Sequence, residues 1–208
     1  MWAFVELADE VMEGDTASFD ESLLLAMRSP DDLSDPIGPT WVEEMARDVT
    51  GLGGVGLLTF LTFAATGFLL LQGKRRVALY LLLAITSGVA MSSALKAGFD
   101  RPRPELVPHG THVYTSSFPS GHSMMATLVF LTVGAVVAGS QPSNSLKAYL
   151  MLLALVLALS VGVSRIYLGV HWPSDVLGGW AMGAAWALLC WAIAGWLRSH
   201  GELERNVD

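Results

Sequence analysis

The chain has 208 residues, 52% of them hydrophobic, and its mean hydropathy of +0.50 is high for a water-soluble domain. The net charge of −7 is local, because residues 1–50 hold thirteen Asp or Glu against two Arg while the remainder is net basic. A single cysteine excludes an internal disulfide bond and a cysteine-based metal site. An integral membrane protein is therefore favoured over a soluble domain.

The acidic segment 1–50 contains no apolar run that is long enough to span a bilayer. Two short amphipathic helices are predicted in it, one over 19–28 with Ser18 as its cap and one over 41–49. These helices lie either along the bilayer surface or over the end of the protein that holds the functional site. Alternatively, the segment is a solvated acidic extension. One interpretation of the largely apolar residues 1–7 is that they end a longer apolar segment.

Five uncharged runs follow, and a helix needs about 20 mostly apolar residues to cross about 30 Å of hydrocarbon. The runs cover residues 50–73, 77–95, 123–146, 148–164 and 176–197. None offers the polar face that a soluble helical bundle needs. A turn-rich stretch ends the third helix near Gly139, and the short fourth run extends to Leu168. We therefore predict an all-α integral membrane helical bundle of about five transmembrane helices, preceded by short amphipathic or interfacial helices.

Basic residues at the span ends predict the topology. One face collects Lys74, Arg75, Arg76, Lys147 and Arg198, and the positive-inside tendency makes that face cytoplasmic. The predicted organisation is an acidic extracytoplasmic or interfacial segment at 1–50, a transmembrane domain at 51–198 and a cytoplasmic tail at 199–208.

Three short charged stretches fall where spans end at the opposite face. They run from Lys96 to Pro104, from Pro119 to His122 and from Ser164 to Asp175. Lys96, Arg103 and Arg165 offer three cations there, and guanidinium groups suit bidentate contact with phosphate oxygens. The topology therefore predicts one pocket that binds an anion such as phosphate.

The second stretch has the composition of a helix start. Ser120 is placed to cap the third span, and Gly121 gives close access to the free amides of the first turn, where an anion binds at the positive end of the helix dipole. The same string is also an ordinary helix start, in which His122 is more often a solvated neighbour of the cap than a catalyst.

In the third stretch His171 and Asp175 are four residues apart, and Pro173 suits the first turn of the last span. If both side chains share one helix face, Asp175 accepts the N–H of His171 and leaves the other ring nitrogen free as a nucleophile. Taken alone, the pair is more simply explained as a helix cap. No serine is placed for a catalytic triad, and no His-Glu-x-x-His zinc motif occurs.

Taken together, the stretches resemble the motifs of the type 2 phosphatidic acid phosphatase family, membrane lipid phosphatases of the vanadium haloperoxidase-like superfamily. Lys96 is followed after six residues by Arg103-Pro104, then by Pro119-Ser-Gly-His122, and then by Ser164-Arg165 with five residues to His171 and three more to Asp175. The order and the spacing are those of the family, and the resemblance covers roughly residues 50–197. Family members commonly have one span more than the five found here, so the sequence leaves open whether an initial span is missing.

The resemblance implies a role for each matched residue. His171 is the expected nucleophile, Asp175 holds its ring, and His122 acts as general acid and then as general base. The expected phosphate cradle consists of Lys96, Arg103, Ser120, Gly121 and Arg165. Arg101 lies beside this set, and it either assists substrate binding or is solvated in the loop.

The implied reaction is hydrolysis of a phosphomonoester or diphosphate of a lipid, such as polyprenyl diphosphate, phosphatidylglycerol phosphate or phosphatidate, through a phosphohistidine. The family implies no metal and no other cofactor. The expected partners are the lipid substrate and the bilayer, with no nucleic acid, and the expected location is the bacterial inner (plasma) membrane with the active site on the extracytoplasmic face. The oligomeric state is not predicted.

Two alternatives remain beside this reading of the motifs. One is a non-catalytic protein that binds or transports anionic lipids, which does not require both His122 and His171. The other is a vanadate-dependent haloperoxidase, whose phosphate-like pocket is similar but whose members are soluble, against the five spans predicted here.

Overall fold

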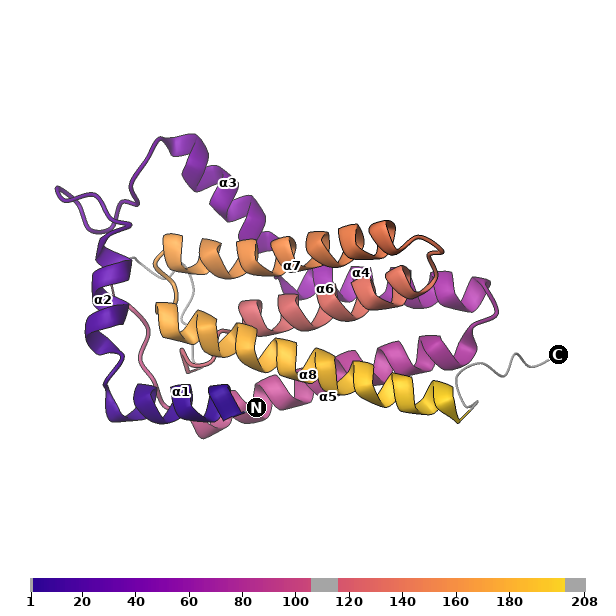
Figure 1. Cartoon of the computed structure of the whole chain (residues 1–208). Helices are drawn as coiled ribbons and strands as arrows, with labels where there is room; N and C mark the ends of the chain where they lie inside the picture. The colour runs from indigo at the N-terminus through magenta and orange to yellow at the C-terminus, as the bar shows by residue number, and fades with distance from the viewer. Residues whose placement is uncertain (1, 106–115, 201–208) are drawn as a thin grey trace.

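The computed structural model describes residues 2–105 and 116–200, and the regular elements in that part of the chain are helices. They are α1 (Trp2–Glu13), α2 (Ala17–Leu25), α3 (Thr40–Gly51), α4 (Val55–Leu71), α5 (Arg75–Gly98), α6 (Gly121–Gly139), α7 (Asn144–Tyr167) and α8 (Pro173–Ser199). Figure 1 shows α4 to α8 side by side in one long bundle, with α1, α2 and α3 gathered at one end. The predicted all-α membrane bundle is confirmed.

Four helices, α5 to α8, are long and apolar enough to cross a membrane. The shorter α4 forms a bent pair with α3, with an angle of 48° between them, and a fifth span results if this pair counts as one. The predicted number of spans is thus confirmed on that count. Within the uncharged run 50–73, residues 50 and 51 belong to α3, and α4 begins at Val55. The third span ends at Gly139 as predicted, and α7 extends to Tyr167.

The acidic N-terminal segment is packed against the bundle. The helix predicted over 41–49 is α3, and the one predicted over 19–28 is α2, but Thr16 occupies the N-cap position of α2 without a side-chain cap bond, so the cap assigned to Ser18 is wrong. The first helix, α1, contacts α8 and buries apolar side chains against Phe118. The segment therefore does not lie in solvent as a free extension.

The central helix is α6, which contacts α4, α5, α7 and α8. Two glycines four residues apart let α8 approach it closely: a Cβ on Gly179 would lie 2.7 Å from the Ser120 carbonyl oxygen, and one on Gly183 would lie 2.5 Å from that of Met124. The Ser120 amide also donates to the Asp175 carbonyl oxygen at 2.9 Å. This contact fixes the starts of α6 and α8 next to each other.

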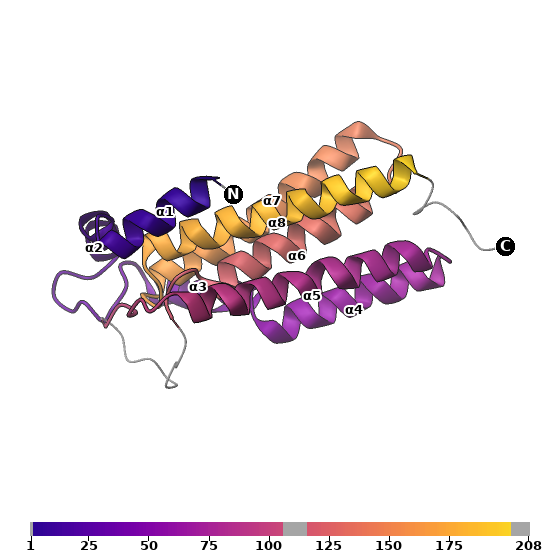
Figure 2. The same cartoon turned by 90° about the horizontal axis from the view of Figure 1, so that it is seen from below.

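The direction of the helices then brings the three charged stretches to one end. At that end α5 and α7 finish while α6 and α8 begin, as both views of the bundle show (Figures 1 and 2). The basic residues that predicted a cytoplasmic face lie at or near the opposite ends of the same helices. Of the predicted tail 199–208, all but the first two residues lie outside the described part of the chain.

Candidate active site

A cavity of about 630 Å³ opens at the end of the bundle where the charged stretches meet. Its lining includes six of the predicted site residues, namely Lys96, Arg103, Gly121, His122, Arg165 and His171. Within the described residues, no Asp or Glu belongs to this lining. Because three cations face the cavity and no carboxylate belongs to the described lining, the cavity attracts anions.

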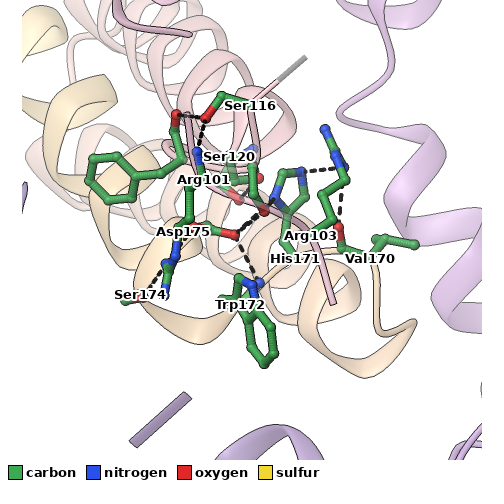
Figure 3. A network of polar contacts seen from close by, with 12 residues as sticks. Arg101, Arg103, Ser116, Ser120, Val170, His171, Trp172, Ser174 and Asp175 are labelled. Carbon is green, nitrogen blue, oxygen red and sulfur yellow. Dashed lines mark hydrogen bonds and ion pairs between the residues drawn. The ribbon is translucent and has the colours of Figure 1, made fainter. Parts of the chain in front are cut away.

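His171 lies in the loop between α7 and α8 and is only 1% exposed. The Arg103 Nη1 atom lies 3.1 Å from His171 Nε2, and it also donates to the Val170 carbonyl oxygen at 3.1 Å (Figure 3). Since a guanidinium group can only donate, Nε2 must carry the lone pair and Nδ1 the proton. Burial lowers the pKa of His171 to about 3, although the hydrogen bond and charge of Asp175 oppose this shift. The imidazole is therefore neutral at physiological pH.

Asp175 holds the protonated side of this ring. Its Oδ2 atom lies 3.3 Å from His171 Nδ1 and accepts the Trp172 amide at 2.9 Å. The helix α8 starts at Pro173, so His171 precedes the helix, and the two side chains do not meet as neighbours on one helix face. Asp175 instead turns back over the helix start, where it caps the helix and orients the histidine at once. The sequence leaves open whether Asp175 contacts His171 or caps the helix, and in the structure it does both.

Two further groups bind Asp175, and sequence reasoning missed one of them. The Ser117 hydroxyl donates to Oδ2 at 2.5 Å and lies 3.4 Å from His171 Nδ1. The Arg101 Nη1 atom donates to Oδ1 at 2.7 Å. Ser117 is fully buried, and its only sequence clue is its place two residues before Pro119. Asp175 thus has four donors within 3.3 Å and is held in one orientation.

Arg101 is expected from the sequence either to assist substrate binding or to be solvated in the loop. In the structure it does not line the cavity, and its guanidinium group is bound by other residues. Its second terminal nitrogen, Nη2, donates to Asp20 Oδ2 of α2 at 2.6 Å. Asp20 is 1% exposed and also accepts the Ser174 amide at 2.8 Å and the Ser174 hydroxyl at 2.6 Å. The guanidinium therefore joins the N-terminal segment to Asp175 and takes no place among the groups that face the cavity.

The three cations of the cavity come from three elements. Arg103 lies in the loop after α5, and burial lowers its pKa while Asp175 opposes the shift. Lys96 lies in the last turn of α5 and donates to the Ser116 carbonyl oxygen at 3.2 Å. Arg165 lies in the last turn of α7, and its Nη1 donates to the Thr50 hydroxyl of α3 at 3.1 Å. The Nε atoms of Arg103 and Arg165 are buried without a hydrogen-bond partner among the described residues.

The start of α6 contributes unequally to the cavity. Gly121 and His122 line it, and neither ring nitrogen of His122 has a hydrogen-bond partner within the described residues. Ser120 is fully buried and is not part of the lining. Its hydroxyl is the N-cap of α6 and accepts from the Ser123 hydroxyl at 3.0 Å and from the Ser123 amide at 3.5 Å. Two residues of this stretch, Ser120 and Gly121, are predicted to bind phosphate. In the structure Gly121 lines the cavity, whereas the Ser120 side chain is buried and does not.

Comparison with known proteins extends these observations. A family model described as the PAP2 superfamily matches residues 77–199. Phosphatidylglycerophosphatase B of Bacillus subtilis is 34% identical over 144 residues, which are 69% of this chain and 70% of that protein. Lipid A 1-phosphatase of Rhizobium etli is 28% identical over 182 residues and covers 74% of each chain. The crystal structure of a transmembrane PAP2 type phosphatidylglycerolphosphate phosphatase from Bacillus subtilis is similar with a TM-score of 0.81 and 28% identity, covering 94% of each chain.

Proposed function

The chain belongs to the PAP2 superfamily, and we propose from this premise that it is a membrane phosphatase that hydrolyses a phosphomonoester or diphosphate of a lipid through a phosphohistidine at His171. The observation that carries the proposal is the neutral His171 ring. Its Nδ1 atom faces Asp175, its Nε2 atom carries the lone pair beside Arg103, and His171 lines the same cavity as Lys96, Arg103 and Arg165.

In the first half of the reaction Arg103 Nη1 donates to a phosphoryl oxygen in place of His171 Nε2. The Nε2 lone pair then attacks phosphorus, and the bond from phosphorus to the leaving oxygen breaks. His122 enters this step as the imidazolium, donates its proton to that oxygen and is left neutral, so the lipid leaves as a neutral alcohol or as a shorter phosphate. In the second half His122 removes a proton from water, which attacks the phosphohistidine and releases phosphate. Arg103, Arg165 and Lys96 stabilise the charge on the phosphoryl oxygens in both halves.

The shape of the cavity supports a lipid rather than a soluble phosphate ester. Beyond its polar end, the lining continues along α4 and α5 with apolar side chains such as Leu58, Phe63, Leu82, Ile85 and Val89. An acyl or prenyl chain fits between these helices while its phosphate reaches the cations. Polyprenyl diphosphate, phosphatidylglycerol phosphate and phosphatidate all meet this description.

We further propose that the active site faces outward from a bacterial inner membrane. The opposite end of the bundle carries Lys74, Arg75, Arg76, Lys147 and Arg198, and basic loops remain preferentially in the cytoplasm. Labelling of single cysteines in a Cys190→Ala background tests this orientation. Glu105→Cys is expected to react with an impermeant reagent from outside intact cells and Arg75→Cys only after lysis, and the reverse pattern would invert the topology.

The activity is tested by phosphate release from phosphatidate, phosphatidylglycerol phosphate, polyprenyl diphosphate and lipid A, with purified protein in micelles and His171→Ala as the blank. We expect one lipid class to be turned over well above the blank. A substrate labelled in its terminal phosphate should also label wild-type protein covalently, in a form stable to alkali and labile to acid, and should leave His171→Ala unlabelled. Undiminished turnover by His171→Ala would refute the nucleophile, and no turnover of any lipid would favour the anion-binding alternative.

A further inference from the structure

A second cavity, of about 490 Å³, lies at the end of the bundle away from the candidate active site. It is formed by α5, α6, α7 and α8, with Tyr80, Thr132, Lys147, Trp191 and Arg198 among its lining residues. We propose that this cavity is a second, non-catalytic site that binds an anionic phospholipid of the adjacent leaflet, with an acyl chain inside and the lipid phosphate at Lys147 and Arg198.

The wall of the cavity suits an acyl chain. Most of its lining residues are apolar, and the volume is within the range of about 300 to 1,000 Å³ that is usual for sites of small ligands. On the outer rim Leu188 is 64% exposed and Trp191 is 62% exposed, so the cavity opens sideways to the region that lipid occupies. A chain can therefore enter from the bilayer without passing through water.

The charges at the mouth select the headgroup. Lys147 and Arg198 are the only charged residues in the lining, and within the described residues neither makes a salt bridge. Residues 121–200 contain one acidic residue, Asp175, and it lies at the other end of the bundle. Two cations beside an apolar cavity, with no carboxylate among the described residues to neutralise them, complement a phosphate attached to an apolar chain.

The wall also holds a polar group that lacks a partner. The Thr132 hydroxyl is buried and makes no hydrogen bond with any described residue, although a hydroxyl in a helix commonly bonds to the carbonyl one turn earlier. This oxygen is itself buried beneath the cavity surface, so selection of the headgroup rests on Lys147 and Arg198 and not on Thr132.

The competing explanation is that these cations merely belong to the basic cytoplasmic face. Arg75 provides a matched control, because it is an exposed cation at the same end that does not line the cavity. A specific site depends on Lys147 and Arg198 and is indifferent to Arg75, whereas a general surface attraction depends on all of them.

The test compares phosphatidylglycerol with phosphatidylcholine of the same chains, by thermal unfolding of the purified protein in detergent and by native mass spectrometry of retained lipid. The phosphodiester headgroup of phosphatidylglycerol has no terminal phosphate to be released. We expect phosphatidylglycerol to raise Tm more than phosphatidylcholine in wild type and Arg75→Ala. The difference should disappear in Lys147→Ala/Arg198→Ala, and inorganic phosphate should produce none. A difference that persists in the double variant, or that Arg75→Ala loses equally, overturns the proposal.

A second variant tests the cavity apart from its charges. Ala135 lines the cavity in α6, and Ala135→Phe narrows it while both cations remain. Retention of phosphatidylglycerol relative to phosphatidylcholine is measured for each protein, so that a general loss of stability cancels. We expect this ratio in the mass spectrum to be lower for Ala135→Phe than for wild type. Equal retention would show that the chain does not lie in the cavity and would also overturn the proposal.

Discussion

Asp20 and Asp175 bind the same guanidinium group, although one lies in the N-terminal helix α2 and the other in the last helix. Asp20 Oδ2 is 2.6 Å from Arg101 Nη2, and Asp175 Oδ1 is 2.7 Å from Arg101 Nη1. Asp20 does not line the cavity, so it acts on the proposed reaction only through Arg101 and the start of α8. It is a positioning residue.

Asp20→Asn is expected to lower kcat roughly 10- to 100-fold with little change in KM, because a small displacement of Asp175 tilts the nucleophile without touching the phosphate cradle. Steady-state kinetics on the best substrate of the panel provides the measurement. Glu21→Gln, at the exposed next position of the same helix, is the matched control and should behave as wild type. A variant that loses thermal stability yet keeps its kcat would contradict the positioning role.

The protonation of His171 gives a prediction about pH. Burial lowers its pKa to about 3, so its folded value lies below the ordinary value of about 6.5. Between these two values the unfolded chain binds a proton that the folded chain does not, and the contribution of His171 to stability is full above about pH 6.5 and declines as the pH falls. Histidine ¹⁵N spectra, assigned with His171→Gln, should show a neutral ring protonated on Nδ1 at about pH 5. Titration near pH 6.5 would contradict the buried neutral ring.

Helix packing is tested by two alanine substitutions in α8. A Cβ on Gly183 would lie 2.5 Å from the Met124 carbonyl oxygen and 2.9 Å from Thr127 Cβ, whereas one on Gly195 meets nothing within 4 Å. Gly183→Ala should therefore lower the free energy of unfolding by about 1–3 kcal/mol, as overpacking does, and Gly195→Ala should not. Melting curves in one detergent compare the two. Equal curves would mean that α6 and α8 are not in close contact.

Metal removal tests the proposed use of cations from the protein itself. Lys96, Arg103 and Arg165 supply the positive charge that a bound divalent ion supplies in other phosphatases, so activity should be unchanged after dialysis against EDTA. The measurement is phosphate release before and after chelation. Loss of turnover that Mg²⁺ or another divalent ion restores would show that the reaction depends on a metal.

The parts that the sequence predicts well are those that depend on local pattern. Uninterrupted apolar runs locate α5 to α8, and the motif spacing selects Arg103 rather than Arg101 as the cation of the cavity. Both arginines precede a proline, and composition alone does not distinguish them. The motifs then come together because each lies at a helix end. Successive spans run in opposite directions, so the ends of α5 and α7 and the starts of α6 and α8 lie at the same face.

The parts that the sequence does not predict are buried polar contacts between distant segments. Asp20 is one of thirteen acids in residues 1–50, and nothing in its neighbourhood marks it as the buried one. Thr50 is likewise an ordinary helix residue until the bend between α3 and α4 brings it to Arg165. Such contacts arise only once tertiary packing has placed the helices.

Asp20 and Thr50 both lie before residue 77, where the family match begins. A chain cut at that point would keep every motif of the family and yet lose the carboxylate that holds Arg101 and the hydroxyl that holds Arg165. The residues that carry the family motifs and the residues that hold two of the site arginines therefore lie in different parts of the chain. The motifs identify the proposed chemistry, while part of the support for the site comes from α2 and α3.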